Sequence, residues 1–314
     1  MRFFRKPTFF MSAPCCPPHC RHAPVDIEGS LNESCFFQVA WSINPHMVVG
    51  TASPIKAMHQ HARFVQTLRE VGAHIILLPF LHAAYDSVFV KDSAILKQEA
   101  HGISALVTKP SHDERKMESR QRQFHLERRG IEVVDRSSRH LEGGDVVVSH
   151  SLGKVFMGYG FRTEREAAKE LSNFFESEVI PLELKDPHFY HLDVALSILK
   201  DGTAFACREA FTAESWERLQ SCGLRSLVQV TKQEAMKFGL NWVEINDSIV
   251  MGSHLPRLKR ILRSMGKSVY DSPLDQFQLA GGSAACLVSE LHDFESPSPH
   301  AFAAGHALSS YEKA

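Results

Sequence analysis

One cysteine near the end of the sequence has a setting that suits a nucleophile. Cys286 follows Gly281, Gly282 and Ser283 and precedes two apolar residues. A lone cysteine in an apolar stretch is more often a small buried side chain than a reactive one. Glycines, however, are costly to order in a folded chain and are typical of places where the backbone passes close to a ligand. We therefore take Cys286 as the candidate nucleophile.

A histidine and an aspartate two residues apart provide a candidate acid and base. Residues 189–193 read Phe-Tyr-His-Leu-Asp and lead into an apolar run. If this stretch is extended, His191 and Asp193 lie on the same face. A neighbouring carboxylate favours the charged imidazole, which suits proton transfer near neutral pH. A buried histidine satisfied by a nearby aspartate would have the same sequence signature.

Two further acidic motifs lie beside predicted strands. Residues 86–92 read Asp-Ser-Val-Phe-Val-Lys-Asp, and even spacing along a strand would place Asp86 and Asp92 on one face. Glu142 begins the motif Glu-Gly-Gly-Asp, whose glycines permit a tight backbone close to a ligand. Each motif alone is equally compatible with ordinary turn residues at a strand end.

Together these motifs predict an acidic pocket beside a thiol. They contain a cysteine, a histidine and several carboxylates, without a second basic group assigned beside the nucleophile. Unpaired buried carboxylates are unfavourable, so we expect the ligand to supply the cation. A guanidinium has forked N–H donors that pair with carboxylates such as Asp92, Glu142 and Asp193. The expected partner is a small cationic guanidino compound.

Alternating strands and helices are predicted to position these motifs. Strands are predicted at 47–49, 74–78, 87–95, 145–149, 154–157, 179–182, 194–199, 204–206, 226–230, 248–251 and 284–289, and helices at 59–71, 163–175, 212–220 and 255–264. The units recur at intervals of roughly forty to fifty residues, which indicates a repeated strand-helix module. We predict one α/β domain over residues 30–293, with flexible tails at 1–29 and 294–314.

The four motifs, taken in their order along the chain, resemble those of a known enzyme family. They are similar to the guanidino-group-modifying enzymes of the pentein superfamily, which include arginine deiminases, dimethylarginine dimethylaminohydrolases and amidinotransferases. The resemblance extends from about residue 35 to residue 290 and includes Ile-Asn-Pro-His-Met at 43–47. It implies a five-bladed α/β propeller, with pseudo-fivefold strand-helix modules around a central active site.

The resemblance also implies a role for each candidate residue. Cys286 would attack the guanidinium carbon, and His191, oriented by Glu142, would protonate the leaving amine and then activate water. A thiouronium bound to the cysteine would link the two steps. The implied substrate-binding residues are Asp92 and Asp193 for the guanidinium, Arg115 and Arg162 for an α-carboxylate, and Asp86 and Asn241 as further pocket residues. No metal and no organic cofactor is required.

The reaction within the family stays open at this point. A hydrolase would release citrulline with ammonia or an alkylamine, an amidinotransferase would use an amine in place of water, and a non-catalytic protein would only bind guanidines. Asp193 after the histidine favours the deiminases and amidinotransferases, whereas the short chain and residues 87–92 favour the dimethylargininases. Ala285 and His46 depart from residues common in relatives.

The composition excludes several function classes. The 314 residues carry a net charge of −1 and no apolar run long enough to span a bilayer, so neither nucleic acid nor a membrane is an expected partner. Seven scattered cysteines favour a reducing compartment, and we expect the cytoplasm. A mitochondrial-type leader in the basic first 25 residues is the alternative, as is a start at Met11. A homo-oligomer is compatible with the sequence.

The N-terminal cysteines and histidines suggest a second, weaker possibility. Cys15, Cys16, His19, Cys20 and His22 could bind zinc, because thiolates and imidazoles are its usual ligands. Their spacing matches no familiar zinc pattern, and they fall in the predicted tail. We therefore expect this segment to be disordered rather than to bind a metal.

Overall fold

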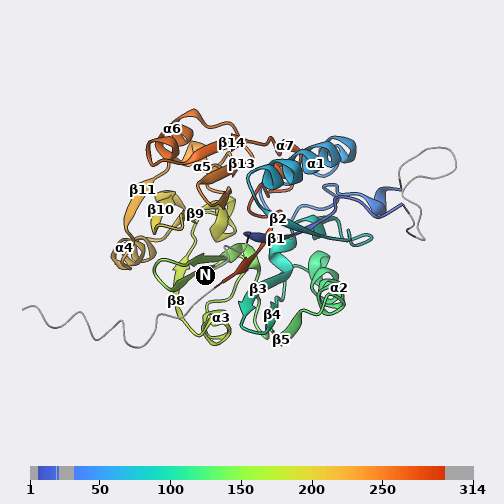
Figure 1. Ribbon diagram of the computed structural model, residues 1–314, viewed down its shortest axis with the longest axis horizontal. Coiled ribbons are helices and arrows are strands. Elements are labelled where there is room, and N and C mark those ends of the chain that lie inside the picture. Colours follow the sequence, from blue (N-terminus) through green and yellow to red (C-terminus); the bar gives the residue numbers. More distant parts are fainter. Residues whose placement is uncertain (1–5, 19, 21–31, 294–314) are drawn as a thin grey trace, which may run out of the picture.

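Four β-sheets with helices around them make up the part of the chain that the structure describes. The structure is a computed structural model and describes residues 6–18, 20 and 32–293. Figure 1 shows the longer helices at the periphery and the strands nearer the centre. The predicted α/β class is therefore confirmed.

Three of the sheets share one connectivity. Each begins with an antiparallel pair of strands, continues through a helix, and ends with a strand parallel to the second. The units are β6 (Val146–Ser149), β7 (Lys154–Tyr159), α3 (Ala167–Phe175) and β8 (Glu178–Glu183); β9 (Leu196–Ile198), β10 (Thr203–Ala206), α4 (Ala213–Ser221) and β11 (Ser226–Gln229); and β12 (Val243–Ile245), β13 (Ser248–Met251), α6 (Pro256–Ser264) and β14 (Ser268–Asp271). The predicted strand-helix repeat is present.

The fourth sheet contains the same connectivity twice. Its order is β2-β1-β15-β3-β4-β5. One half consists of β3 (Ala94–Glu99), β4 (Gly102–Val107), α2 (Lys116–Glu127) and β5 (Glu132–Arg136), and the other of β15 (Ser289–His292), β1 (Thr8–Ser12), α1 (Pro54–Glu70) and β2 (His74–Leu78). The second half combines the two ends of the described chain, because β15 pairs antiparallel with β1.

The position of β1 corrects the predicted N-terminal tail. Residues 8–12 lie between β2 and β15, and Phe9, Phe10 and Met11 are buried there. A strand with neighbours on both sides satisfies its backbone groups, so this segment belongs to the folded domain. The predicted C-terminal tail, 294–314, lies outside the described residues.

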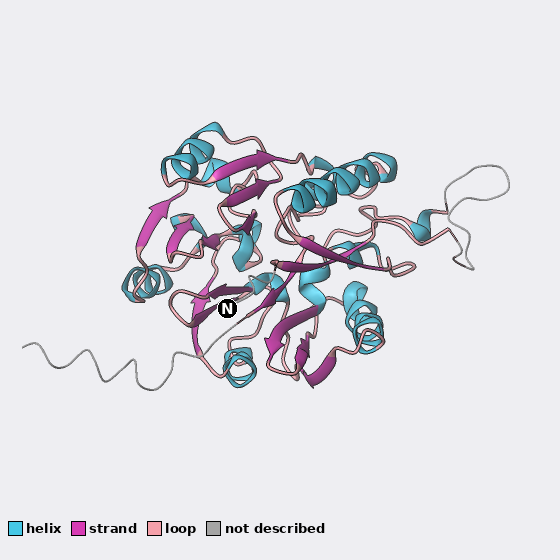
Figure 2. Cartoon of the chain, viewed as in Figure 1, coloured by secondary structure: helices cyan, strands magenta, loops and turns pink. Residues whose placement is uncertain are grey.

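The predicted helices are present with adjusted ends. Ser53 caps α1 by accepting a hydrogen bond from the Lys56 amide, and Thr212 caps α4 in the same way. Helix α2 was not predicted, since its sequence has few apolar residues, and the predicted strand at 47–49 is a turn. Figure 2 shows that the helices flank the strands. Among the described residues, every helix is too short or too polar to cross a membrane.

Candidate active site

Short 3-10 helices, rather than strands, carry the candidate residues. The predicted strand at 87–95 is two such turns, η2 (Tyr85–Val88) and η3 (Val90–Ser93), and β3 begins only at Ala94. Asp86 and Asp92 therefore do not share a strand face. Glu142 immediately precedes η5 (Gly143–Asp145), and His191 immediately precedes η7 (Leu192–Val194). The turns η3, η5 and η7 each lead into a strand, β3, β6 and β9.

A buried pair formed by His191 and Glu142 is the most ordered part of the site. His191 Nε2 lies 2.9 Å from Glu142 Oε2, and both side chains are almost completely buried. The other oxygen of Glu142 accepts hydrogen bonds of 3.0 Å from the amide and the hydroxyl of Ser111. Arg162 donates to Glu142 Oε2 at 3.0 Å. The carboxylate is thus held from three sides.

The carboxylate beside His191 differs from the one that the sequence predicted. Residues 192–194 form a 3-10 turn, so His191 and Asp193 do not lie side by side as they would in a strand. Asp193 instead faces Cys286 and Lys91. The hydrogen bond from His191 goes to Glu142, in agreement with the orienting role that the family resemblance implied for this residue.

Electrostatics keep this pair charged. Burial alone would lower the pKa of His191, but the charges of Asp92 and Glu142 outweigh it and raise the pKa to about 9. For Glu142, burial would raise the pKa, but Arg162 and the hydrogen bond with His191 hold it well below its usual range. At neutral pH the site therefore contains an imidazolium next to a carboxylate.

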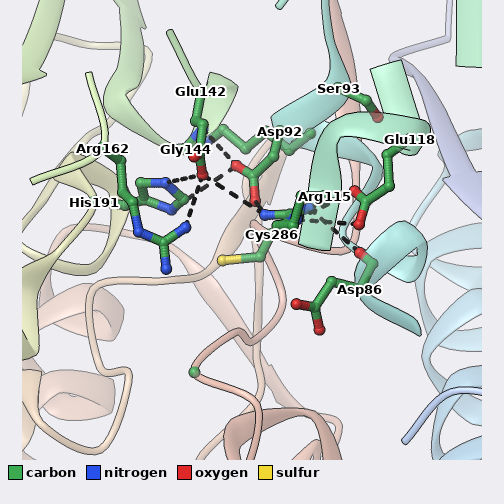
Figure 3. Close-up of polar contacts among 12 residues, drawn as sticks. Asp86, Asp92, Ser93, Arg115, Glu118, Glu142, Gly144, Arg162, His191 and Cys286 are labelled. Carbon is green, nitrogen blue, oxygen red and sulfur yellow. Dashed lines mark hydrogen bonds and ion pairs between the residues drawn. The ribbon is translucent and has the colours of Figure 1, made fainter. Parts of the chain in front are cut away.

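The thiol of Cys286 is held by an asparagine and an aspartate. Asn241 Nδ2 donates to Sγ at 3.1 Å, and Asn241 Oδ1 accepts from the amides of Ala285 and Cys286 at 2.9 and 3.3 Å. Sγ lies 3.6 Å from Asp193 Oδ2. The predicted strand at 284–289 is a turn that ends where β15 begins. In Figure 3 the side chains of Cys286 and His191 extend toward the same space.

Without a bound substrate, the thiol of Cys286 is uncharged. Burial is the main reason that the pKa of Cys286 lies well above its usual value, and the charges of Asp193 and Asp92 raise it further. Lys91 partly opposes this effect. A cation that enters beside Sγ would lower the pKa by the same Coulombic interaction.

The site contains cations of its own, which corrects the expectation of an unpaired acidic pocket. Lys91 Nζ lies 2.9 Å from Asp193 Oδ2. Arg115 donates to Asp92 Oδ2 at 2.7 Å, and Glu118 pairs with the other side of the same guanidinium at 2.7 Å. The carboxylates of Asp193 and Asp92, whose charges a bound ligand was expected to neutralise, are already paired with these internal cations.

The remaining predicted residues line a narrow cavity beside the thiol. Asp86, Asp92, Arg115, Arg162, Tyr190 and Cys286 are among its walls, and its volume is only about 10 Å³, enough for about one water molecule. Asp86 accepts a hydrogen bond of 2.7 Å from the Trp41 indole. Burial raises the pKa of Asp86, although Arg115 and that hydrogen bond oppose the rise.

Comparison with known proteins identifies the family. Residues 49–293, most of the chain, match the family described as N,N dimethylarginine dimethylhydrolase, eukaryotic. The chain belongs to this family. The resemblance to guanidino-group-modifying enzymes of the pentein superfamily is therefore confirmed.

Individual relatives agree with this assignment. The N(G),N(G)-dimethylarginine dimethylaminohydrolase of Mycobacterium tuberculosis is 30% identical over 292 residues, which cover 93% of this chain and 94% of that protein. The structure is similar to the product-bound N-terminal domain of ArgZ, a cyanobacterial arginine dihydrolase, with a TM-score of 0.80, 26% identity and coverage of 92% and 98% of the two chains. A dimethylarginine dimethylaminohydrolase adduct, at 17% identity and a TM-score of 0.67 over 91% of this chain and all of that one, shares the fold.

Several residues of this family member's site were missed from sequence. Lys91, Ser111, Glu118 and Tyr190 hold or line the catalytic candidates. Lys91 lies inside the motif at 86–92, next to Asp92. A basic residue between the two acidic ends of that motif was the sequence signal that could have indicated its place in the site. Ser111 and Glu118 lie around the start of α2, a helix that the apolar pattern did not predict, and the available signal in this region was Arg115, which the family resemblance had implied as a substrate-binding residue.

A metal ion does not suit these catalytic candidates. Oxygen and nitrogen atoms of Asp92, Glu142 and His191 come within 4.8 Å of one another, as metal ligands do. The guanidinium groups of Arg115 and Arg162 lie 3.7 and 3.0 Å from Glu142 Oε2, so a divalent cation would face two positive charges. The arrangement fits proton transfer better.

Proposed function

We propose that this protein is a hydrolase that cleaves a carbon–nitrogen bond in the guanidino group of an arginine-type small molecule. Arginine and N-methylated arginines are the proposed substrates, with citrulline and ammonia or an alkylamine as products. The single observation that supports this most is the buried ion pair of His191 and Glu142, because Asp92, whose charge acts on His191, also acts on the thiol of Cys286. The names of the relatives, dimethylarginine dimethylaminohydrolase and arginine dihydrolase, point to the same reaction class.

The proposed reaction has two covalent steps. The Cys286 thiol releases its proton to water as the substrate cation binds, and the thiolate Sγ then adds to the guanidinium carbon while the imidazolium of His191 protonates the departing nitrogen and the carbon–nitrogen bond breaks. A thiouronium remains on the cysteine. The now neutral His191 removes a proton from water, the resulting hydroxide adds to the same carbon, and the carbon–sulfur bond breaks to release the ureido product and the thiol. With a pKa of about 9, His191 is protonated before the first step.

Substrate binding must displace the internal cations. Asp92 and Asp193 are the proposed guanidinium ligands, and they now pair with Arg115 and Lys91. A substrate guanidinium would replace one or both partners, and its charge beside Sγ would favour the thiolate. The displaced Arg115, together with Arg162, is proposed to bind the α-carboxylate. Because the cavity holds only about 10 Å³, the pocket must widen as the substrate enters.

We also infer a pseudo-fivefold arrangement of the fold. Five units with the same strand-strand-helix-strand connectivity support it, and the residues that we assign to the site, apart from Arg115 and Arg162, come from the turns between units. Two of the five units share the six-stranded sheet. The proposed fivefold axis therefore relates the five units to one another and does not relate five separate sheets.

The test is a substrate panel. Arginine, methylated arginines, agmatine and homoarginine would be incubated with the purified protein and with Cys286→Ser, and the ureido product would be measured with and without added glycine. We expect product from at least one arginine-type substrate without glycine, and none from Cys286→Ser. Consumption of arginine that requires glycine and yields ornithine and a new guanidino compound, with no ureido product, would indicate an amidinotransferase. Turnover by Cys286→Ser near the unaltered rate would exclude the covalent mechanism.

A further inference from the structure

Three cysteines and a histidine converge at the N-terminal edge of the domain, away from the catalytic candidates. Cys16 and Cys20 follow β1, Cys35 ends η1 (Glu33–Cys35), and His82 lies in the loop after β2. The ligand atoms of Cys16, Cys35 and His82 all lie within 4.8 Å of one another. The thiol of Cys20 is close enough to Cys16 and Cys35 to affect the pKa of both. Cys20 therefore adjoins the two cysteines of this group.

Backbone hydrogen bonds hold these residues in place. The amide of Cys16 donates to the carbonyl of Cys35 at 2.8 Å, and the amide of Cys20 donates to Pro17 at 2.9 Å. The amide of Ala83, next to His82, donates to Ser34 at 2.8 Å. The group is thus formed by the fold, and its cysteines are free thiols rather than disulfides.

The distances match a tetrahedral zinc site. Zinc bonds thiolate sulfur at about 2.3 Å and imidazole nitrogen at about 2.0–2.1 Å, so tetrahedral angles place the two ligand atoms roughly 3.6 Å apart. Cys35 Sγ and His82 Nδ1 are 3.6 Å apart. Three thiolates and one imidazole form a usual ligand set of structural zinc, and the separation of Cys16 and Cys20 falls in the usual range for paired cysteine ligands. We propose that Cys16, Cys20, Cys35 and His82 bind a structural zinc ion.

This proposal revises the earlier expectation for the N-terminal cysteines. The segment was expected to be a disordered tail, yet Cys16 is buried and Cys20 packs against the core. His19 and His22 lie outside the described residues. Cys15 pairs through its backbone with Phe36 and is not one of the four proposed ligands. The missing ligands were Cys35 and His82, which are too distant in sequence to complete a recognisable motif.

The proposed site would tie an N-terminal segment to a loop that leads into the catalytic region. Three of the four ligands precede residue 49, where the match to the family model begins. His82 is followed closely by η2, which carries Asp86, and the Leu81 amide donates to Ser87 at 3.3 Å. Zinc would therefore restrict both segments, and its loss would loosen this side of the pocket.

Metal analysis of zinc-supplemented protein tests the proposal. All variants carry Cys286→Ala, so that the catalytic thiol cannot contribute to metal binding. We expect about one zinc per chain in this background and in the control Cys222→Ser, which alters a half-buried cysteine after α4, and loss of most zinc in Cys35→Ser and His82→Ala. Replacement by Co²⁺ should give the thiolate charge-transfer and tetrahedral ligand-field bands, which weaken in the same two variants.

Chelation tests the site without a substitution that could prevent folding. Dialysis of the Cys286→Ala protein against a strong chelator should lower Tm by several degrees, and equimolar zinc should restore it. Protein that binds no zinc after reconstitution, or Cys35→Ser protein that keeps a full equivalent, would overturn the proposal. Peptide mapping that finds a Cys16–Cys35 disulfide in the reconstituted protein would do the same.

Discussion

The ammonium group of Lys91 lies 2.9 Å from Asp193 Oδ2, and the same carboxylate lies 3.6 Å from the sulfur of Cys286. Lys91 and Asp193 also line a second cavity, of about 120 Å³, together with Trp242 and Glu244. The ion pair thus lies between that cavity and the thiol. The charge of Lys91 opposes part of the rise in the thiol pKa that Asp193 and Asp92 cause.

Substitutions on the two sides of this ion pair should shift the pKa of Cys286 in opposite directions. Lys91→Met removes a positive charge and should raise the pKa of the thiol, whereas Asp193→Asn removes the largest negative contribution and should lower it. The pH dependence of alkylation by a small haloacetamide measures both shifts. Equal profiles in the two variants would show that the pair does not act on the thiol.

The stability of the protein should fall between neutral and alkaline pH because of His191. Its pKa is about 9 in the folded state against an ordinary value of 6.5, so its stabilisation is complete below about pH 6.5 and is lost as pH rises through 9. A shift of this size corresponds to roughly 3 kcal/mol. Urea unfolding at pH 6.5 and 9.5 should show this loss in the unaltered protein and a smaller one in His191→Gln. The same loss in both proteins would assign it to other groups.

Gly144 leaves no room for a side chain next to the catalytic candidates. A Cβ atom there would lie 2.4 Å from His191 Nδ1 and 2.9 Å from Asp92 Oδ1. Gly144→Ala should therefore displace His191 and lower kcat by about a hundredfold or more, since small misplacements are costly in catalysis. Gly102→Ala is the matched control, because its Cβ would meet nothing within 4 Å. Steady-state kinetics on both variants, with a circular dichroism spectrum, decide the matter.

Asn241 should be important for both stability and catalysis. It is fully buried, supports Sγ, and accepts from the amides of Ala285 and Cys286. Asn241→Ala leaves those amides without this acceptor, and we expect a loss of about 1–3 kcal/mol in the free energy of unfolding together with a lower kcat. In Asn241→Asp the acceptor remains but a negative charge faces the thiol, so alkylation of Cys286 should require a higher pH. Unaltered alkylation in Asn241→Asp would contradict this role.

Arg162 should distinguish substrates by their carboxylate. Arg162→Gln would remove a charge-assisted hydrogen bond to an α-carboxylate, and kcat/KM for arginine should fall roughly tenfold to a hundredfold more than for agmatine, which lacks that group. Because Arg162 also contacts Glu142, some loss with both substrates is expected. The ratio between the substrates is the measurement, and an unchanged ratio would mean that Arg162 supports only Glu142.

The sequence indicated which residues belong to the candidate site better than it indicated which of them pair with one another. Cys286, His191 and Glu142 were singled out because glycine-rich motifs and apolar runs mark them locally. That His191 pairs with Glu142 depends on the contact of η5 with η7, which no local pattern encodes. For the same reason the internal partners of Asp92 and Asp193 were not predicted. The sequence analysis therefore also missed that these partners neutralise the negative charges of the pocket.

The fold was predictable where alternating patterns were clear. Strands β2, β7, β8, β10 and β13 were found close to their observed bounds. The stretch 86–92 has the residue types of a strand, yet it forms two 3-10 turns, because Asp86 and Asp92 turn inward to bond with Trp41 and Arg115. Strand β1 was missed because its partners, β2 and β15, lie far along the chain.

The pairing of β1 with β15 also affects when the thiol can become functional during synthesis. Cys286 comes shortly before Ser289, where β15 begins, and β15 is the strand that joins β1 to β3. A nascent chain that has emerged only as far as α6 has neither the nucleophile nor the strand that bridges the two halves of the large sheet. Under the mechanism proposed above, a chain that stops before Cys286 should therefore be inactive.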